Sequence, residues 1–346
     1  MNLKKILTII AVAVISVLLV YGFILMRQIF SANTKFAEKE LYVYIPTDSK
    51  YEDVKKIIAP YVENLDRFET VANKRDYPKN VKPGRFLFTK GMNSYDLVKT
   101  LRLNAPVNLA FNNQERLENF AGRVGSQIEA DSLSLLKSFK DSIFLKENGF
   151  NEENVLAMFI PNTYELYWNT SADKFRDKMI KEYRNFWNKE RVAKAAKQGL
   201  TPIEATILAS IVHKESVKKD ERPRIAGVYL NRLRAQMPLQ ADPTVIYAIK
   251  KKSNDFDQVI KRVFYNDLTM SSPYNTYMNI GLPPGPIAMP DITALEAVLN
   301  PEKNNYIYFC ASVDRFGYHE FAATLEEHNK NAKKYSDWIN SQGVKR

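Results

Sequence analysis

The residue best suited to chemistry is an acid near the end of an apolar segment, TPIEATILASIVHKES, at residues 201–216. At helical spacing, Glu215 falls on the same face as Leu208, Ile211 and Val212. A carboxyl group beside aliphatic side chains loses hydration, so its pKa is expected to rise above about 4.3. A raised pKa suits a general acid near neutral pH, which makes Glu215 a candidate catalytic residue. The alternative is a structural glutamate that pairs with a nearby lysine or arginine.

The histidines and the cysteine do not have the spacing of a metal site. His213 and Glu215 form a His-x-Glu pair of the kind found in zinc deaminases, but that signature also needs a Pro-Cys-x-x-Cys partner. Cys310 is the only cysteine, and the other two histidines, His319 and His328, lie far along the chain. We therefore expect no metal site and no disulfide framework, with Cys310 as a small buried residue of a strand.

A second group of candidate residues lies in two proline-rich segments downstream. Gln240 and Asp242 occupy a proline-bounded turn, MPLQADP, before another predicted helix, and SSPYNTYMNIGLPPGPIAMP places Tyr274, Asn275 and Tyr277 in a stiff loop. Aromatic rings beside amide and hydroxyl groups suit a sugar chain, because rings cover its apolar faces while polar groups bond its edges. A structural loop whose tyrosines pack on the core has the same composition, so both interpretations stay open.

The elements that position these residues follow an uncharged N-terminal stretch. At about 1.5 Å per residue, residues 6–26 can span a hydrocarbon core of about 30 Å. A signal peptide is the alternative, but its apolar region is usually about 7–15 residues long and ends in a cleavage site, which RQIFSANTKF does not provide. We predict an uncleaved transmembrane anchor. The basic residues on its two sides nearly balance, but a five-residue tail before a long domain usually lies inside, so residues 1–5 are expected to be a cytoplasmic tail and the rest of the chain to lie outside the cytoplasm.

The composition indicates a folded, basic chain. Hydrophobic residues make up 45% of the 346 residues and aromatic residues 12%, which is enough to fill folded cores. The formal net charge of +11 and an isoelectric point near 9.3 favour anionic partners. Because the anchor places the chain outside the cytoplasm, we expect lipid headgroups or an acidic polymer rather than nucleic acid.

Two folded regions are predicted after a polar spacer at residues 27–40. Residues 41–105 combine a strand, two helices, a second strand and a further helix capped by Asn93 or Ser94. Residues 106–346 mix helices and strands, so the chain is assigned to the α+β class.

Several elements of the larger region can be placed individually. A strand opens it at APVNLAFNN, the segment MFIPNTYELYWNTS is aromatic and turn-rich, and residues 172–200 are predicted to form one long basic amphipathic helix. TPIE, at residues 201–204, has the pattern of a helix start with a capping box, and TALE, at residues 293–296, repeats it. NNYIYFCAS is typical of a central strand.

Taken in order, these segments resemble the membrane-anchored endolytic murein transglycosylases of the YceG-like family. The resemblance covers nearly the whole chain and is strongest in ASIVHKES, ERPRIAGVYLNRLRAQMPLQADPTVIYAI, YNTYMNIGLPPGPIAMP and YIYFCASVDRFGYHEFAATLEEHNK. MFIPNTYEL is similar to the family's Phe-Pro-Asp-Thr-Tyr segment, and residues 41–105 are similar to its LysM-like subdomain. The chain departs from the family pattern at Asn162, His213 and Ser216, where aspartate, glutamate and threonine are usual, and GYHEF replaces a glycine- and histidine-rich turn.

This resemblance implies an α+β fold with a single N-terminal transmembrane helix, a small LysM-like subdomain and a YceG-like catalytic domain at residues 106–346. It implies a single-pass protein of the bacterial inner membrane, with a cytoplasmic N-terminus and a catalytic domain that is periplasmic or extracytoplasmic. The implied partners are peptidoglycan glycan strands and the lipid bilayer, with peptidoglycan synthases as further candidates and no nucleic acid. No metal or cofactor is called for.

The implied reaction cleaves the MurNAc–GlcNAc bond within nascent glycan strands and leaves 1,6-anhydro-MurNAc ends, with termination of strand elongation as a candidate role. Glu215 would donate a proton to the glycosidic oxygen and then take one from the muramoyl 6-hydroxyl as that oxygen closes on C1, where ordinary glycosidases use two carboxyl groups. By motif, the glycan groove is expected to be lined by Asn231, Gln240, Asp242, Thr244, Tyr274, Asn275 and Tyr277.

Two other functions stay open at this point. A lysozyme-like hydrolase would use Glu215 with Asp242 as a second carboxylate and would leave reducing ends. A non-catalytic peptidoglycan-binding scaffold would grip glycan through the LysM-like unit, and Glu215 would then be structural. The LysM-like unit itself either binds glycan or only spaces the catalytic domain from the bilayer.

Overall fold

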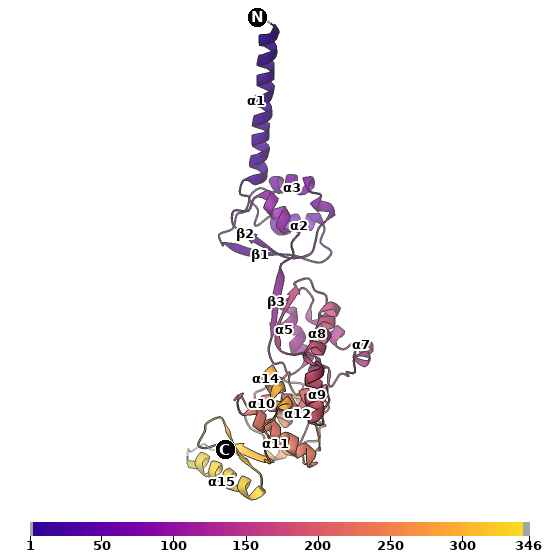
Figure 1. The fold of residues 1–346 in the computed structure, drawn as a ribbon, viewed down its shortest axis with the longest axis vertical. Helices are drawn as coiled ribbons and strands as arrows, with labels where there is room; N and C mark the ends of the chain where they lie inside the picture. Colours follow the sequence, from indigo (N-terminus) through magenta and orange to yellow (C-terminus); the bar gives the residue numbers. More distant parts are fainter. Residues whose placement is uncertain (1–2, 342–346) are drawn as a thin grey trace. The chain divides into compact units, whose positions relative to one another are not determined.

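The N-terminal apolar stretch forms one long helix. The computed structural model describes residues 3–341, and its first helix, α1, spans Leu3–Phe30 (Figure 1). The most apolar window of α1 has a mean hydropathy of 2.9 and is not buried, so its length and composition suit a membrane anchor or a signal sequence. The helix is longer than the predicted stretch at 6–26. Residues 1–2 of the predicted tail at 1–5 lie outside the described residues.

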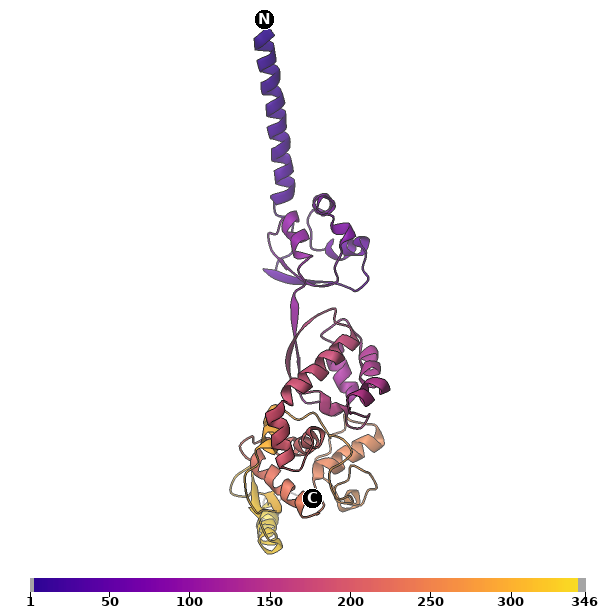
Figure 2. The same ribbon diagram turned by 45° about the vertical axis from the view of Figure 1, so that its right-hand side comes forward.

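The chain divides into two compact units, and the first is built around a two-stranded antiparallel sheet. Strands β1 (Glu40–Ile45) and β2 (Gly84–Thr89) pair along their whole lengths. Its shorter helices are α2 (Tyr51–Ile58), α3 (Leu65–Lys74) and α4 (Ser94–Thr100). Helix α1 leads into this unit (Figures 1 and 2). The predicted order of strand, two helices, strand and helix is therefore confirmed.

Aromatic side chains fill the core of this first unit. Phe86 and Phe88 alternate with less buried residues along β2, as the two-residue period of a strand requires, and they meet Phe68 and Tyr77 in one buried cluster. Asn93 caps α4, because its side-chain oxygen accepts a hydrogen bond from the main-chain N–H of residue 96 at 2.8 Å. The N-cap is thus the first of the two predicted candidates.

The segment predicted as a spacer packs on this unit. Residues 27–30 belong to α1, and the side chain of Asn33 is fully buried. Its amide donates to the carbonyl oxygen of Asn64 at 2.8 Å and to the hydroxyl of Ser94 at 2.9 Å. Asn33 therefore ties the chain that follows α1 to the residue before α3 and to the first residue of α4.

A second two-stranded sheet pairs β3 (Pro106–Phe111) with β4 (Asn162–Tyr167). Strand β3 agrees with the prediction, whereas β4 lies in the segment that was expected to be turn-rich. Tyr164 and Leu166 are buried and alternate with exposed neighbours along β4, so the strand period is present but short. Both strands contribute residues to both units.

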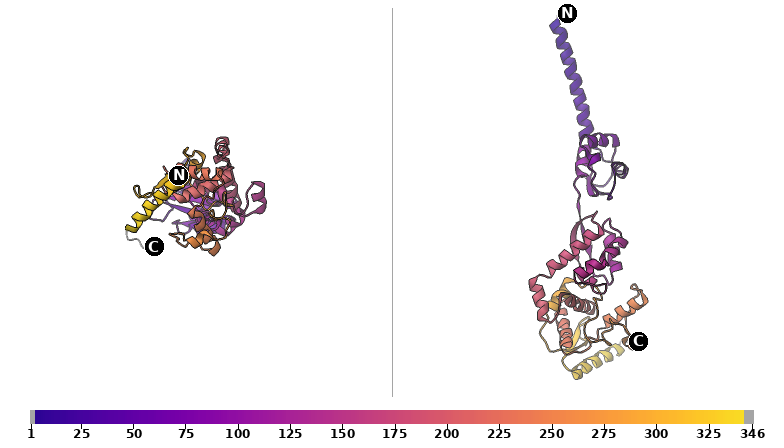
Figure 3. Two further views of the ribbon diagram at one scale, coloured as in Figure 1. Left: turned by 90° about the horizontal axis from the view of Figure 1, so that it is seen from below. Right: turned by 90° about the vertical axis from the view of Figure 1, so that its right-hand side faces the viewer.

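The second unit contains most of the helices and has a short sheet. Its helices are α5 (Leu117–Gly125), α6 (Ser132–Phe139), α7 (Ser142–Glu147), α8 (Ala172–Phe186), α9 (Lys189–Lys197), α10 (Pro202–Glu215), α11 (Arg222–Arg234), α12 (Asp242–Ser253), α13 (Tyr265–Leu268), α14 (Ile292–Leu299) and α15 (Leu325–Ser341). Helix α15, drawn in yellow, lies at the edge of this unit in Figures 1 and 3 and has no buried residue. Together with the sheets, these helices make the fold a mixed α+β one.

The sheet of the second unit corrects one prediction. Strands β5 (Tyr308–Ala311) and β6 (His319–Ala322) are antiparallel, with Ala311 opposite His319. Among residues 3–341, β5 pairs with β6 alone, so it is not the central strand that its apolar sequence suggested. Cys310, which was expected to be buried, is only half-buried.

Helix α10 lies at the centre of the second unit and packs against α11, α12 and α14. Its residues from Ala205 to Val212 are all buried, so the helix is covered on every side. The face formed by Leu208, Ile211 and Val212 is buried as expected, and the small residues Ala205, Ala209 and Ser210 let neighbouring elements approach the other faces too.

Two helix boundaries differ from the sequence prediction. The predicted helix at 172–200 is two helices, α8 and α9, because Asn188 starts a new helix by accepting a hydrogen bond from the N–H of Arg191 at 3.0 Å. Helix α14 is capped by Asp291, which accepts from the N–H of Ala294 at 2.9 Å, and not by the predicted Thr293. Side chains that can cap a helix outnumber helix starts, so spacing alone selects the wrong one here.

The capping box of α10 gives a first prediction. The hydroxyl of Thr201 accepts from the N–H of Glu204 at 3.3 Å, and the carboxylate of Glu204 accepts from the N–H of Thr201 at 2.8 Å. Thr201→Ala removes one half of the box, so we expect the free energy of unfolding to fall by about 1 kcal/mol in a urea titration. Thr201→Ser keeps the hydroxyl and is the control. Equal stability of Thr201→Ala and the wild type would contradict the prediction.

Candidate active site

Glu215 is the last residue of α10, where the buried helix reaches the surface of the second unit. Ser216 leaves the helix in an extended conformation and is buried. The hydroxyl of Tyr229, a buried residue of α11, donates a hydrogen bond to Oε2 of Glu215 at 3.1 Å. Glu215 itself is partly exposed, so its carboxyl group has apolar surroundings and still has access to the outside.

Burial raises the pKa of Glu215 above its usual value. The imidazole of His319, the hydrogen bond from Tyr229 and the guanidinium of Arg232 oppose this change, while the carboxylate of Asp242 reinforces it. The direction agrees with the expectation from the sequence. A carboxyl group of this kind can hold its proton at a pH where an exposed glutamate has lost it.

Asp242 and Tyr277 lie together beside Glu215. Asp242 is the first residue of α12, and its Oδ1 accepts a hydrogen bond from the hydroxyl of Tyr277 at 2.6 Å. Asp242 is exposed and Tyr277 is half-buried, so both remain accessible. Burial raises the pKa of Tyr277, and the Asp242 hydrogen bond and the charge of Glu215 raise it further. Of the predicted site residues, Glu215, Asp242 and Tyr277 therefore form one electrostatic cluster.

Gln240 lies in the turn that leads to Asp242. Its backbone has a left-handed φ of 49°, which only a minority of residues adopt, and its N–H donates to the carbonyl of Thr276 at 3.0 Å. Its side chain is exposed, and its Oε1 accepts from the guanidinium of Arg232 at 3.3 Å. Gln240 is thus accessible, but its backbone position is fixed by the loop that carries Tyr277.

The polar groups of the other four predicted groove residues are used within the protein: Asn231, Thr244, Tyr274 and Asn275. The amide of Asn231 donates to the main-chain carbonyls of Asn304 and Tyr306, at 3.0 and 2.9 Å. The hydroxyl of Tyr274 donates to the carboxylate of Glu153 at 2.8 Å.

Thr244 and Asn275 are completely buried. Thr244 donates to the carbonyl of Ala241 at 2.7 Å, and its hydroxyl lies 2.8 Å from that of Thr276. The amide of Asn275 donates to the carbonyls of residues 268 and 270, at 2.9 and 2.8 Å. These two side chains hold the loops that present Asp242 and Tyr277.

Arg232 was not selected from the sequence, yet it organises this part of the site. It is buried on α11, one turn after Tyr229, and donates to the carbonyls of residues 239 and 307 at 2.8 and 2.6 Å. Burial lowers its pKa from the usual arginine value. The guanidinium group of Arg232 binds both the turn before Asp242 and the residue before β5. Arg232 therefore joins α11 to α12 and to the β5–β6 sheet.

Sequence reasoning also missed the pair that Glu221 forms with the partly buried His319. Glu221 is 5% exposed. Its Oε1 accepts from the main-chain N–H of His319, and its Oε2 pairs with the ring Nδ1, both at 2.8 Å. The hydroxyl of Ser216 donates to the same Oε2 at 3.3 Å. The residue after Glu215 is therefore joined to β6 through Glu221.

A second pair, between the buried Arg222 and the partly exposed Asp291, also holds Ser216. Nε of Arg222 donates to the carbonyl oxygen of Ser216 at 3.0 Å, and its Nη1 lies 2.8 Å from each carboxylate oxygen of Asp291. Although burial opposes it, pairing with His213, Arg222 and Thr293 holds the pKa of Asp291 well below its usual range. Ser216 is thus fixed through both its hydroxyl and its carbonyl, which sets the direction of the Glu215 side chain.

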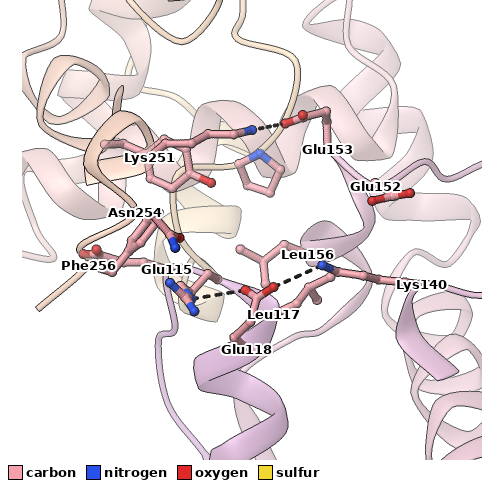
Figure 4. Close-up of a pocket in the computed structure, with 13 residues that line it drawn as sticks. Glu115, Leu117, Glu118, Lys140, Glu152, Glu153, Leu156, Lys251, Asn254 and Phe256 are labelled. Carbon is pink, nitrogen blue, oxygen red and sulfur yellow. Dashed lines mark hydrogen bonds and ion pairs between the residues drawn. The ribbon is translucent and has the colours of Figure 1, made fainter. Parts of the chain in front are cut away.

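A charged hollow of about 270 Å³ lies elsewhere in the second unit, between α5 and α12 (Figure 4). Figure 4 shows Lys251 paired with Glu153 and Lys140 paired with Glu118, at 2.5 and 3.1 Å. Glu115, at its edge, binds two lysines of α10 and α12, which lower its pKa although burial opposes them. Most of the carboxylates in this hollow are thus neutralised by neighbouring lysines.

A metal site is not found among residues 3–341, where no group of three or more histidine, cysteine, aspartate or glutamate side chains is placed to hold an ion.

Comparison with known proteins gives one family and several relatives. The sequence profile of the YceG-like family matches residues 43–334. The endolytic murein transglycosylase of Bacillus subtilis (strain 168) is 37% identical over 203 residues, which are 58% of this chain and 54% of that protein. The endolytic murein transglycosylase of Streptococcus pneumoniae serotype 2 is 27% identical over 336 residues, covering 88% of this chain and 59% of that protein. The chain thus spans between half and two thirds of the length of these relatives.

A crystal structure of a putative yceG-like protein from Listeria monocytogenes is also similar. The two chains are 30% identical and superpose with a TM-score of 0.57. The match covers 85% of this chain and 99% of the other. The similarity therefore extends over most of both molecules.

Proposed function

Because this chain belongs to the YceG-like family, we propose that it is a membrane-anchored endolytic lytic transglycosylase of peptidoglycan, with Glu215 as its catalytic acid and base. The observation that carries this proposal is a single partly accessible carboxyl group whose pKa is raised by burial. The next residue, Ser216, is held through its hydroxyl by Glu221 and through its carbonyl by Arg222. The two relatives named endolytic murein transglycosylase support the choice of substrate.

In the proposed reaction, protonated Glu215 donates to the oxygen between N-acetylmuramic acid and N-acetylglucosamine. The bond from that oxygen to C1 breaks, and the leaving sugar keeps the proton as a hydroxyl group. The Glu215 carboxylate then removes the proton of the muramoyl 6-hydroxyl while its oxygen bonds to C1. The product carries a 1,6-anhydro ring, water is not consumed, and Glu215 ends the cycle protonated again.

Asp242 and Tyr277 are proposed to face the glycan beside Glu215. Both are accessible, and the negative charge of Asp242 helps to keep Glu215 protonated before the sugar binds. Gln240 adds an exposed amide next to them. The other four residues of the predicted groove would act by holding the walls of the groove, since their polar groups already bind the protein's own loops.

The proposal also assigns the position of the enzyme in the cell. Helix α1 would anchor the chain in the bacterial inner membrane, with the N-terminus in the cytoplasm and the second unit outside it. Residues 41–105 would form a LysM-like unit that either binds glycan or spaces the second unit from the bilayer. Glycan strands and the bilayer are the proposed partners, and peptidoglycan synthases and the termination of strand elongation remain predictions.

The proposal is tested by the ends of the cleaved strands. The full chain in detergent is incubated with uncrosslinked glycan, and the new ends are identified by mass spectrometry. Anhydro ends are expected. Reducing ends, which are heavier by one water, would instead indicate a hydrolase that uses Asp242 as its second carboxylate. Intact strands in the presence of a folded protein would indicate a scaffold.

The pH dependence of cleavage gives a second prediction. Cleavage is expected to decline as the pH rises through the pKa of Glu215, because only the protonated acid can donate. Tyr229→Phe removes a hydrogen bond that favours the carboxylate, so the pKa of Glu215 rises further and the decline moves to higher pH. The measurement is the initial rate of end formation across a pH series. The control is Tyr183→Phe, at a partly buried tyrosine of α8. If the rate declined over the same pH range in Tyr229→Phe and in the wild type, the prediction would be contradicted.

A further inference from the structure

Two titratable groups close to Glu215 have no part in the proposed reaction. Glu221 begins the turn into α11 and is almost completely buried, with 3% of its side chain exposed. His319, on β6, is its partner, and the two residues are 98 positions apart in the chain. A buried charge without a partner is costly, so the pairing itself is expected. The geometry of the pairing carries more information.

Glu221 fixes both the position and the orientation of the imidazole. One carboxylate oxygen holds the main-chain N–H of His319 and the other holds the ring Nδ1, each at 2.8 Å. Because an ionised carboxylate only accepts hydrogen bonds, Nδ1 carries a proton. The edge of the ring is packed against Phe309, with centroids 5.1 Å apart. Nε2 is the remaining ring nitrogen, and it makes no hydrogen bond to any residue within 3–341.

The pair is joined to Glu215 along two paths. Ser216 follows Glu215 directly, and its hydroxyl donates to Glu221 at 3.3 Å. Tyr229 binds the Glu215 carboxyl and packs edge-on against Phe309, with ring centroids 5.7 Å apart, and Phe309 in turn contacts His319. The imidazole also acts on Glu215 electrostatically and lowers its pKa. His319 is therefore linked through short contacts to the carboxyl group that is proposed to react.

We propose that Glu221 and His319 are a positioning pair for the cleavage reaction, in which Glu221 orients the imidazole and His319 stabilises the carboxylate that Glu215 becomes after donating its proton. The inference rests on the proposed function of Glu215. Bound to Glu221 through Nδ1, the imidazole favours the charged form of Glu215, which is the form that exists after the proton has been donated. Over the complete cycle His319 neither gains nor loses a proton, because the proton lost by Glu215 goes to the leaving oxygen and returns from the 6-hydroxyl.

Other charged or titratable groups also lie around Glu215, and the variants of the pair leave all of them unchanged. Those that act on it from neighbouring elements are Tyr229 and Arg232 on α11, Asp242 on α12 and Tyr277 in the following loop. Next to His319 on β6, Tyr318 is bound to Asp220 and Glu320 is bound to Ser312.

The test compares His319→Gln and Glu221→Gln with the wild type, using the full chain in detergent and uncrosslinked glycan. Both variants are expected to lower kcat by about 10- to 100-fold, the loss typical of residues that orient a metal-binding side chain, with little change in KM. In His319→Gln the pKa of Glu215 rises, so the decline of activity at high pH moves to higher pH. In Glu221→Gln the same displacement is expected, because the imidazole is no longer oriented.

His328→Gln is the matched control, since His328 is a half-buried histidine of the same unit that stacks on Tyr308 and does not contact Glu221. Its kcat and pH profile are expected to match the wild type. If Glu221→Gln does not fold, as judged by circular dichroism, His319→Gln decides alone. A uniform loss of rate without displacement of the pH profile would assign the pair a purely structural role and overturn the inference.

The outcomes also separate this inference from the proposed function. If the wild type forms anhydro ends and Glu215→Gln does not, the proposed function stands, and a wild-type kcat in His319→Gln then overturns the pair alone. If the folded wild type leaves glycan intact, the proposed function is wrong and the role of the pair is lost with it.

Discussion

Glu215→Gln is expected to reduce the formation of anhydro ends by about 10³-fold, because an amide has nearly the same shape as a carboxyl group but cannot donate the proton. The amide oxygen can still accept the hydrogen bond from Tyr229. Substrate binding is therefore expected to persist, and the loss is expected in kcat rather than in KM. The measurement is end-group analysis of uncrosslinked glycan under conditions where the wild type is linear with time.

The same substitution is expected to leave the fold intact or to stabilise it. Burial raises the pKa of Glu215 in the folded protein above its pKa in the unfolded chain. At a pH above the unfolded pKa, the unfolded chain therefore ionises more easily than the folded protein, and this lowers the free energy of unfolding. Glutamine removes this cost at neutral pH. Stability of Glu215→Gln equal to or above that of the wild type, together with lost cleavage, is the signature of a catalytic residue.

Asp242→Asn is the matched control for this experiment. It removes an exposed neighbouring carboxylate, which is proposed to face the glycan and to act on Glu215 through its charge but not to donate the proton. A decrease in rate much smaller than that of Glu215→Gln is expected. A variant of Glu215 that is both inactive and destabilised would favour the structural glutamate, and equal losses in both variants would favour a two-carboxylate hydrolase.

Features with local signals were predictable from the sequence. The start of α10 needs only the spacing of Thr201, Pro202 and Glu204, and the structure contains this capping box. The raised pKa of Glu215 follows from its place at the end of an apolar segment. Each of these inferences depends on residues within two or three helical turns of one another, and this is the range over which periodicity carries information.

Features that depend on distant partners were not predictable. Arg222 and Asp291 are 69 positions apart, and nothing near either residue in the sequence indicates the other. The same holds for Glu221 and His319. The burial of α10 on all sides also arises from the packing of α11, α12 and α14, which periodicity within one helix cannot reveal.

The loop residues show why composition could not separate binding from structural roles. Tyr274, Asn275 and Tyr277 are close neighbours, and all three have the groups that a sugar-binding loop needs. In the structure, Tyr274 and Asn275 are buried and bind other parts of the protein, and only Tyr277 is partly accessible beside Asp242. The difference is one of side-chain direction, which the sequence of an irregular loop does not specify.

Asp291→Asn is expected to lower the free energy of unfolding by about 3 kcal/mol at neutral pH, because it leaves the guanidinium of Arg222 buried without its counter-ion. The side chain of Arg222 is 4% exposed, and both carboxylate oxygens of Asp291 lie 2.8 Å from its Nη1. The measurement is a urea titration of each protein. The control is Glu302→Gln, which breaks the 2.8 Å pair with Arg224 on the same helix, where both side chains are about 40% exposed, and is expected to cost less than about 1 kcal/mol.

The pH dependence of the Asp291→Asn effect tests its electrostatic origin. The pKa of Asp291 is lowered in the folded state, so its stabilising contribution is complete above the unfolded value of about 3.9 and is lost as the pH falls through the folded value. The difference between wild type and Asp291→Asn is therefore expected to shrink on acidification, whereas a loss of packing alone would be independent of pH. Because Arg222 also holds the carbonyl of Ser216, the variant is expected to lose cleavage activity even where it is folded. Full activity in a destabilised variant would separate the stability of this unit from the positioning of Glu215.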